Sequence, residues 1–210
     1  MRTIFGLMLV LSTTAVSCGG SDAAPAGAGG AAGAAGQASD SGPNGSGGSS
    51  GNGGVSAGAF SLTSNIFHDG ETIPQDRRCA APSPDLAWTG GPSDAMSYAI
   101  VMKDVTPGLA NGTLHWVLFD IPSAVHSLPE GLQTGYAPAE PAGAHQAPIY
   151  NQTAGFGGPC GGNNTYEITL HALDVATLPG IDATSSGRAA ASAIESHSTA
   201  HVTMTILSHP

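Results

Sequence analysis

Five apolar runs, separated by clusters of Pro, Gly and Asn, follow one another from residue 60 to residue 207. They cover residues 60–62, 97–102, 115–121, 166–173 and 200–207. In the last two runs every second residue is apolar, at Ile168, Leu170 and Ala172 and at Val202, Met204 and Ile206. This is the period of a half-buried strand. The runs predict strands, and the turn residues between them favour an antiparallel Greek-key β-sandwich.

A single helix is predicted, late in the chain. Over residues 183–197 side chains recur at helical spacing, at Ala189, Ala193, Ile194 and His197. Thr184 or Ser185 stands before them as a candidate N-cap. The predicted class is therefore mainly β with a minor C-terminal helix.

The N-terminus has the pattern of an export signal. Arg2 supplies a positive charge, residues 4–11 are apolar, and Ala15-Val16-Ser17-Cys18 resembles the lipobox of bacterial lipoproteins. The apolar stretch is shorter than the about 20 residues that span a bilayer, which predicts a cleaved signal peptide over residues 1–17. We predict that Cys18 is acylated and anchors the protein in the bacterial cell envelope, at the outer membrane or the periplasmic face. The alternative is a plain secretory signal that leaves Cys18 as a free thiol.

Residues 18–58 differ sharply in composition from the rest of the chain. They are rich in Gly, Ala and Ser, and their only charged side chains are those of Asp22 and Asp40. Such a segment cannot bury enough apolar surface to fold, which predicts a disordered tether with a span of roughly 35 Å. The remaining residues, 59–210, have the length of one globular domain.

The chain is acidic. Its 15 Asp and Glu against 5 Lys and Arg give a formal net charge of -10, and Lys103 is its single lysine. Such a surface repels phosphate backbones and anionic head groups, which argues against nucleic-acid partners and electrostatic docking to membranes. We expect membrane contact only through the N-terminal lipid.

With Cys18 set aside, Cys79 and Cys160 form an even pair in an oxidising compartment, which predicts a disulfide. The bond would close a loop of about 80 residues and contribute roughly 3 to 5 kcal/mol. The alternative is a pair of thiolate metal ligands. It is disfavoured because neither cysteine has a second Cys or a His at the short spacing of zinc sites.

The chain lacks the motifs of the common enzyme classes. It has no Gly-x-Ser-x-Gly elbow and no phosphate-binding loop ending in Lys. His197 and His201 are four residues apart, but they straddle the predicted helix end and have no glutamate between them. We therefore predict a protein that is not an enzyme and that carries no cofactor and no metal.

An ordered string of short motifs runs through the predicted domain. It consists of Phe60-x-Leu62-x-Ser64-x-x-Phe67-x-Asp69-Gly70, Ser83-Pro84-Asp85-Leu86-Ala87-Trp88, Asp104-x-x-Pro107, His115-Trp116-Val117, Gly158-Pro159-Cys160 and Tyr166-x-x-x-Leu170-x-Ala172-Leu173-Asp174. In order and spacing it resembles the phosphatidylethanolamine-binding protein family, and most of all its bacterial YbhB/YbcL-type, Raf-kinase-inhibitor-like branch. The resemblance covers nearly all of residues 60–207.

The resemblance implies two antiparallel sheets packed face to face, with a small anion-accepting pocket at one end. The pocket residues that it carries over to this chain are Asp104, Pro107, His115, Asn164 and Tyr166. The family's second pocket histidine is Asn164 here and its arginine is Thr165. An amide cannot carry positive charge, so we expect weaker anion binding, strongest below the pKa of His115. Selectivity should shift toward neutral or zwitterionic groups.

Two functions follow from these expectations. The first is an exported, membrane-tethered binding protein with a small pocket for an anionic or polar head group, which inhibits or regulates a partner protein. The second is a structural or interaction lipoprotein with a degenerate, non-binding pocket, in which His115 is only a core histidine satisfied by a carbonyl. The loop over residues 131–152 is expected to bring His145 and Tyr150 to the pocket rim.

Overall fold

The structure is a computed structural model and describes residues 58–208. Its strands are β1 (Ser61–Thr63), β2 (Leu86–Thr89), β3 (Ser97–Asp104), β4 (Thr113–Pro122), β5 (Ser127–Leu128), β6 (His145–Gln146), β7 (Asn164–Leu173) and β8 (Ser198–Ser208). Helical structure is found in a short 3-10 turn, η1 (Gln75–Arg77), and in the helix α1 (Gly187–His197).

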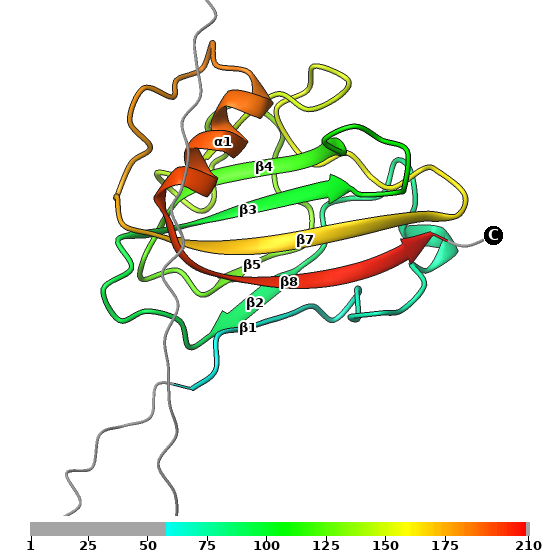
Figure 1. Ribbon diagram of the computed structural model, residues 1–210, viewed down its shortest axis with the longest axis horizontal. Helices are drawn as coiled ribbons and strands as arrows, with labels where there is room; N and C mark the ends of the chain where they lie inside the picture. The colour runs from blue at the N-terminus through cyan, green and yellow to red at the C-terminus, as the bar shows by residue number, and fades with distance from the viewer. Residues whose placement is uncertain (1–57, 209–210) are drawn as a thin grey trace, which may run out of the picture. The chain divides into compact units, whose positions relative to one another are not determined.

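Two antiparallel sheets and the helix form three layers (Figure 1). The larger sheet has the strand order β6-β4-β3-β7-β8, and the smaller has the order β1-β2-β5. α1 packs against β4 and β7 of the larger sheet. The mainly β class with two antiparallel sheets and a C-terminal helix is confirmed, while the Greek-key order of the connections stays a prediction.

The larger sheet is the middle layer, and its two faces belong to different cores. One core joins it to the smaller sheet, through residues that include Trp88, Leu128, Met102, Trp116 and Ile168. The other core joins it to α1, through residues that include Val101, Val117, Ala190 and Ile194. Every residue of β3 except Lys103 is buried, which explains why this run is continuously apolar and shows no alternation.

The five predicted strands form, and most extend beyond the predicted ends. The two alternating runs correspond to β7 and β8. β8 is an edge strand of the larger sheet, and β7 is its neighbour. Strands β2, β5 and β6 were not predicted. They contain four, two and two residues, which is too short to show a period.

The predicted helix is confirmed, but its start was wrong. α1 begins at Gly187, and its N-cap is Ser186, whose hydroxyl accepts a hydrogen bond from a backbone N–H three residues on at 3.2 Å. Thr184 and Ser185 do not cap it because they form a turn around Asp182. The Asp182 carboxylate accepts hydrogen bonds from the backbone N–H of Thr184 at 2.8 Å and from the Ser185 hydroxyl at 3.3 Å.

The buried face of α1 is also shifted from the predicted one. It consists of Gly187, Ala190, Ala191 and Ile194, while Ala189 is exposed. The shift brings Gly187 against the loop before β7, where an added Cβ would lie 2.0 Å from the carbonyl oxygen of Pro148. The close approach of this backbone sets the position of the helix on the sheet.

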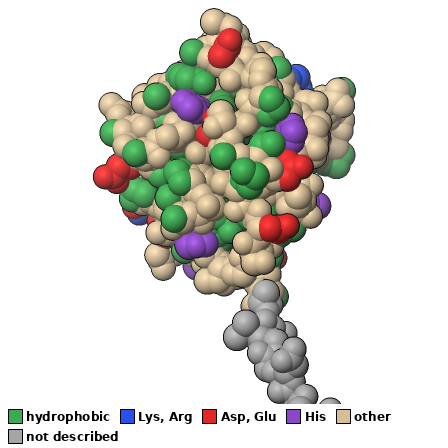
Figure 2. Space-filling model, turned by 90° about the vertical axis from the view of Figure 1, so that its left-hand side faces the viewer, with side chains coloured by type: hydrophobic (Ala, Val, Ile, Leu, Met, Phe, Trp, Pro, Cys, Tyr) green, Lys and Arg blue, Asp and Glu red, His purple; other side chains and the backbone are tan. Residues whose placement is uncertain are grey.

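Acidic side chains are spread over the surface of the described domain. Figure 2 shows Asp, Glu and His scattered over one face, with hardly any Lys or Arg in view. This distribution agrees with the net charge of -10 and gives no basic patch for a polyanion on that face.

The predictions for the signal peptide (1–17), for Cys18 and for nearly all of the tether (18–58) lie outside the described residues. Among residues 58–208, no helix combines the length and the apolar character that crossing a membrane requires.

We expect Gly187→Ala to lower the free energy of unfolding by about 1 to 3 kcal/mol, as overpacking does. In an uncrowded helix the same change stabilises a protein by roughly 0.5 to 1 kcal/mol. The sign of the change in the free energy of unfolding therefore reports the contact with Pro148. Urea denaturation followed by circular dichroism measures this change. Gly162→Ala is the control, because nothing lies within 4 Å of its added Cβ. A stabilised Gly187→Ala protein would contradict the close approach.

Candidate functional site

Three strands bring the predicted site residues to one end of the larger sheet. Asp104 is the last residue of β3, His115 lies near the start of β4, and Asn164 and Tyr166 open β7. The antiparallel register fixes their proximity, because Asp104 is the partner of Tyr166 on one side and of Thr113 on the other. Strands β3, β4 and β7 run side by side in Figure 1.

A β-bulge aims the His115 side chain into this cluster. Lys103 pairs with Leu114 and Met102 pairs with Trp116, so that His115 is the extra residue without a partner on β3. Leu114 faces the core under α1, and Trp116 faces the core between the sheets. The His115 ring then meets the Tyr166 ring edge to face, with centroids 5.0 Å apart and an interplanar angle of 85°.

The Asp104 carboxylate is buried and is held by three donors. Its Oδ1 accepts from the backbone N–H of Thr106 at 3.0 Å and from the Thr106 hydroxyl at 2.5 Å. Its Oδ2 accepts from Nδ2 of Asn164 at 2.6 Å. The ion pairs found within residues 58–208 do not include this carboxylate, so these hydrogen bonds stabilise its charge.

Asn164 links the carboxylate to the rest of the cluster. Besides Asp104, its Nδ2 donates to the Tyr166 hydroxyl at 3.3 Å. Its backbone N–H donates to the Ser208 hydroxyl at 3.2 Å, and that hydroxyl donates to the Gly161 carbonyl at 2.5 Å. An added Cβ at Gly161 would lie 2.2 Å from Nδ2 of Asn164. The glycine therefore makes room for the amide that replaces the expected histidine.

The hydrogen bonds of His115 fix its tautomer. Nδ1 lies 2.8 Å from the carbonyl oxygen of Gly157, and a carbonyl can only accept, so Nδ1 carries the proton. Burial lowers the pKa of His115 below 6.5, although the Gly157 carbonyl and the Asp104 charge act in the opposite direction. At neutral pH the ring is therefore neutral, and its Nε2 carries the lone pair.

Burial also changes the acidity of Tyr166. Its side chain is 1% exposed. Burial raises the pKa of its hydroxyl, and the nearby Asp104 charge raises it further, while hydrogen bonds with Asn164, Gly161 and Ser208 partly oppose the shift. The hydroxyl stays protonated at physiological pH, so it serves as a hydrogen-bond donor and acceptor and not as an anion.

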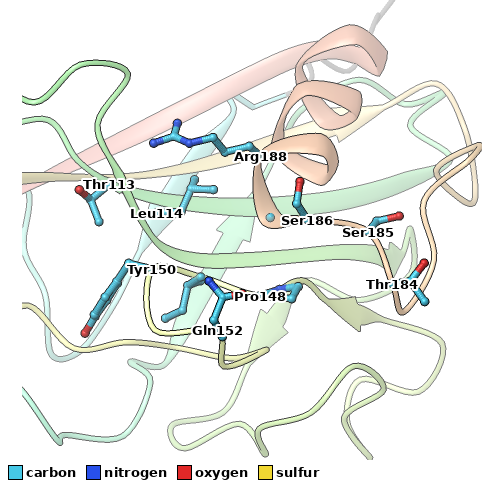
Figure 3. Close-up of a pocket in the computed structure, with 11 residues that line it drawn as sticks. Thr113, Leu114, Pro148, Tyr150, Gln152, Thr184, Ser185, Ser186 and Arg188 are labelled. Carbon is cyan, nitrogen blue, oxygen red and sulfur yellow. The ribbon is translucent and has the colours of Figure 1, made fainter. Parts of the chain in front are cut away.

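Tyr150 lies beside this cluster, and its place at the rim of a pocket stays a prediction. Its ring lies 4.9 Å from the His115 ring, centroid to centroid, and the side chain is 50% exposed. Tyr150 lines a cavity of about 360 Å³ that runs past Leu114 and Pro148 to Thr184 (Figure 3). It also lines a second cavity of about 330 Å³ together with Phe156, Gly157 and other residues. The two cavities share Tyr150, and neither is lined by Asp104, His115, Asn164 or Tyr166.

The other predicted residues have different outcomes. Pro107 is exposed in the turn after β3, outside the cluster. His145 is not at the rim, because its Nδ1 pairs with Oδ2 of Asp120 at 3.0 Å on the strand β6. Sequence reasoning missed Thr106, whose hydroxyl donates to Asp104 and accepts from the backbone N–H of Thr165 at 3.0 Å. Its place two residues after an aspartate is a signal for such a turn.

Cys79 and Cys160 lie next to each other, near this end of the domain. Both are thiols in the structure, and the backbone N–H of Cys79 donates to the Pro159 carbonyl at 3.2 Å. The pKa of the Cys160 thiol is raised to about 11. The main cause is burial, and the hydrogen bond with the Cys79 thiol adds to it. The predicted disulfide stays a prediction, with its partners already in contact.

Comparisons with known proteins agree with this architecture. A family model described as phosphatidylethanolamine-binding protein matches residues 63–208. The UPF0098 protein YbhB of Escherichia coli (strain K12) is 28% identical over 156 residues, which is 70% of this chain and 98% of the relative. A UPF0098 protein of Methanothermobacter thermautotrophicus is 34% identical over 118 residues, which is 54% of this chain and 76% of the relative.

Two solved structures share the fold. The crystal structure of E. coli YbcL, described as a new member of the mammalian PEBP family, has a TM-score of 0.65 and 26% identity, and covers 72% of this chain and 98% of its own. A putative phosphatidylethanolamine-binding protein homologue from Chlamydia trachomatis has a TM-score of 0.59 and 24% identity, over the same shares of the two chains. The second likeness concerns the fold alone.

We expect Asp104→Asn to lower the pKa of His115 further, because it removes the negative charge that favours the protonated ring. The substituted amide keeps an acceptor for Thr106, and Asn164 can flip its own amide to accept from the new side chain. Titration of the histidine resonances by NMR measures the shift. Asp94→Asn is the control, because Asp94 is not among the charges that act on His115. An unchanged His115 pKa in Asp104→Asn would contradict the proximity of the two groups.

Proposed function

The chain belongs to the phosphatidylethanolamine-binding protein family, and from this premise we propose that its Asp104, His115, Asn164 and Tyr166 bind a small polar head group. The ligand class is a group that offers hydrogen-bond donors, such as a primary ammonium or a hydroxyl. Zwitterions such as phosphoethanolamine fit this class, and free inorganic anions fit it only at acidic pH.

The observation that carries this proposal is the hydrogen bond from His115 Nδ1 to the Gly157 carbonyl. Because it fixes the proton on Nδ1, the neutral ring presents Nε2 as an acceptor. The Asp104 carboxylate adds negative charge beside it. None of the four cluster residues is a Lys or an Arg, so an anion meets repulsion from Asp104 and a donor group meets acceptors.

Protonation of His115 reverses this preference. Once the pH falls below the lowered pKa, Nε2 becomes a donor and the imidazolium offsets the charge of Asp104. Phosphate or a carboxylate then finds a charge-assisted donor. The selectivity of the proposed site is therefore pH-dependent, with ammonium and hydroxyl ligands favoured near neutrality.

We propose a binding role and not a catalytic one. His115 is hydrogen-bonded to a carbonyl, and its ring contacts the rings of Tyr150 and Tyr166. It lacks the hydroxyl or thiol partner that a nucleophilic mechanism requires among the residues that bond to it in the described chain. A protein partner, inhibited or regulated through the rim at Tyr150, is part of the proposal.

A degenerate pocket is the second candidate function, and two observations favour it: the bond between Asn164 and Asp104, and the burial of His115 with its ring bonded to the Gly157 carbonyl. The bond between Asn164 and Asp104 gives the Asp104 carboxylate and the Asn164 amide nitrogen a partner without a ligand. A ligand must compete with it, or bind beside it at Nε2 of His115. An interaction lipoprotein with the same scaffold and no ligand would need nothing further from these residues.

We expect phosphoethanolamine to perturb the His115 resonances at pH 7.5, and inorganic phosphate to do so only at pH 5.0. NMR titration of the purified chain with each ligand measures both affinities. His115→Gln should weaken binding by about tenfold, or about 1.4 kcal/mol. The matched control is His145→Gln, since His145 pairs with Asp120 away from the cluster. If neither ligand perturbs His115 at either pH, the degenerate pocket is correct.

We propose that export and acylation at Cys18 hold the domain at the bacterial cell envelope and that Cys79 and Cys160 are oxidised there. Mass spectrometry of the protein from the membrane fraction should find a diacylglyceryl-modified Cys18 at the mature N-terminus. It should also find a peptide that joins the other two cysteines and separates on reduction. Cys18→Ala should lose the acyl group and leave the membrane fraction. An unmodified Cys18 in the wild type would refute the anchor.

A further inference from the structure

The face of the larger sheet that carries α1 has two histidines directly opposite each other. His171 of β7 and His201 of β8 are register partners, and their ring centroids are 5.8 Å apart. They line a hollow of about 230 Å³ together with Lys103, Glu167 and Glu195 and other residues. Because neighbouring strand residues point to opposite faces, this hollow is separate from the cluster around Asp104.

The hydrogen bonds of His171 leave one ring nitrogen ready to act as a ligand. The Nδ1 of His171 lies 3.0 Å from the Ser198 hydroxyl oxygen and is hydrogen-bonded to it. Nε2 is then the ring nitrogen left for a ligand. Burial, and next the neighbouring His201, lower the pKa of His171 to about 4. Neutral imidazole, oriented through its other nitrogen, is the form that binds metals.

The spacing of the two rings suits a shared ion. Two imidazoles on one tetrahedral ion, with metal–nitrogen bonds of about 2.0 Å, have ring centroids roughly 5 Å apart. His201 is exposed, so a small rotation of its side chain closes the remaining difference. His171 is only 8% exposed and serves as the fixed partner.

The charges around the hollow favour a cation. Glu167 and Glu195 line it, and Lys103 is the single basic side chain among its lining residues. The Lys103 ammonium lies 2.7 Å from Oε1 of Glu195. Lys103 therefore neutralises one carboxylate and leaves the charge of the other to attract an ion.

We propose that His171 and His201 form a binding site for a divalent transition-metal ion of the Zn²⁺, Ni²⁺ and Cu²⁺ class. Within residues 58–208 no three His, Cys, Asp or Glu side chains gather closely enough to enclose an ion. The protein thus supplies two nitrogen ligands and water supplies the others, as in a site with open positions. An external ligand with a carboxylate or an imidazole can take those positions.

The sequence argued against a metal site at His197 and His201. In the structure His197, at the end of α1, has its Nδ1 2.8 Å from Oδ1 of Asp174. The pairing of His201 depends on the register of two strands and not on a four-residue interval in a helix. Only the positions of both histidines in the two alternating runs of the sequence could have suggested it.

Isothermal titration of the purified full-length chain with ZnCl₂ and with NiCl₂ tests the site. His201→Asn should weaken binding of both ions at least tenfold. His201 is exposed, so thermal unfolding without metal should not change. His171→Asn should have the same effect on binding. Lys103→Met should tighten binding, because it removes the cation that neutralises Glu195.

His68→Asn is the matched control, because His68 lies in a different hollow, and it should bind as the wild type does. Electron paramagnetic resonance of the Cu²⁺-loaded chain should show two coupled nitrogens in the wild type and one in His201→Asn. Unchanged affinity in His201→Asn overturns the proposal. An equal loss in His68→Asn overturns it as well, because binding would then be distributed over surface histidines.

Discussion

The buried carboxylate of Asp104 is the constraint on which this end of the molecule depends. It enters no ion pair found within the described domain, so its three hydrogen-bond donors must be present whenever the protein is folded. Two of these donors belong to Thr106 and fix the turn after β3. The third belongs to Asn164 and fixes the start of β7. The same charge raises the pKa of Tyr166 and opposes the fall in the pKa of His115.

The replacement of the family's second histidine by Asn164 follows the same logic. A histidine at this position would offer a positive charge to an anion when protonated, whereas the amide of Asn164 donates to Asp104 without any charge. The amide needs space close to the turn before β7, and Gly161 supplies it. The result is a cluster with a negative charge, a neutral imidazole and a protonated phenol. Its chemistry favours hydrogen-bond donors over anions near neutral pH.

The sequence predicted the strands and most of the cluster because both depend on local pattern. Alternating apolar residues identified β7 and β8, and the spacing of Asp104, His115 and Tyr166 agreed with a known family. The bulge at His115 was not predictable, because it arises from the pairing of β4 with β3. The start of α1 was missed because Asp182 holds Thr184 and Ser185 in a turn. Pro107 matches the family motif but lies outside the cluster. A motif gives the order of residues along the chain and not the direction in which each side chain points.

Two histidines of this domain, His115 and His171, share one physical arrangement with different consequences. Each is buried, each has a pKa lowered mainly by burial, and each has its Nδ1 hydrogen-bonded to an oxygen. In both cases Nε2 is the ring nitrogen left for a ligand. The surroundings then decide the ligand. Beside Asp104 and the rings of Tyr150 and Tyr166, the proposed ligand of His115 is a small donor group. Beside His201 and two glutamates, on the face of the sheet that carries α1, the proposed ligand is a metal ion. An acidic chain with few cations thus favours electron-poor ligands at both places.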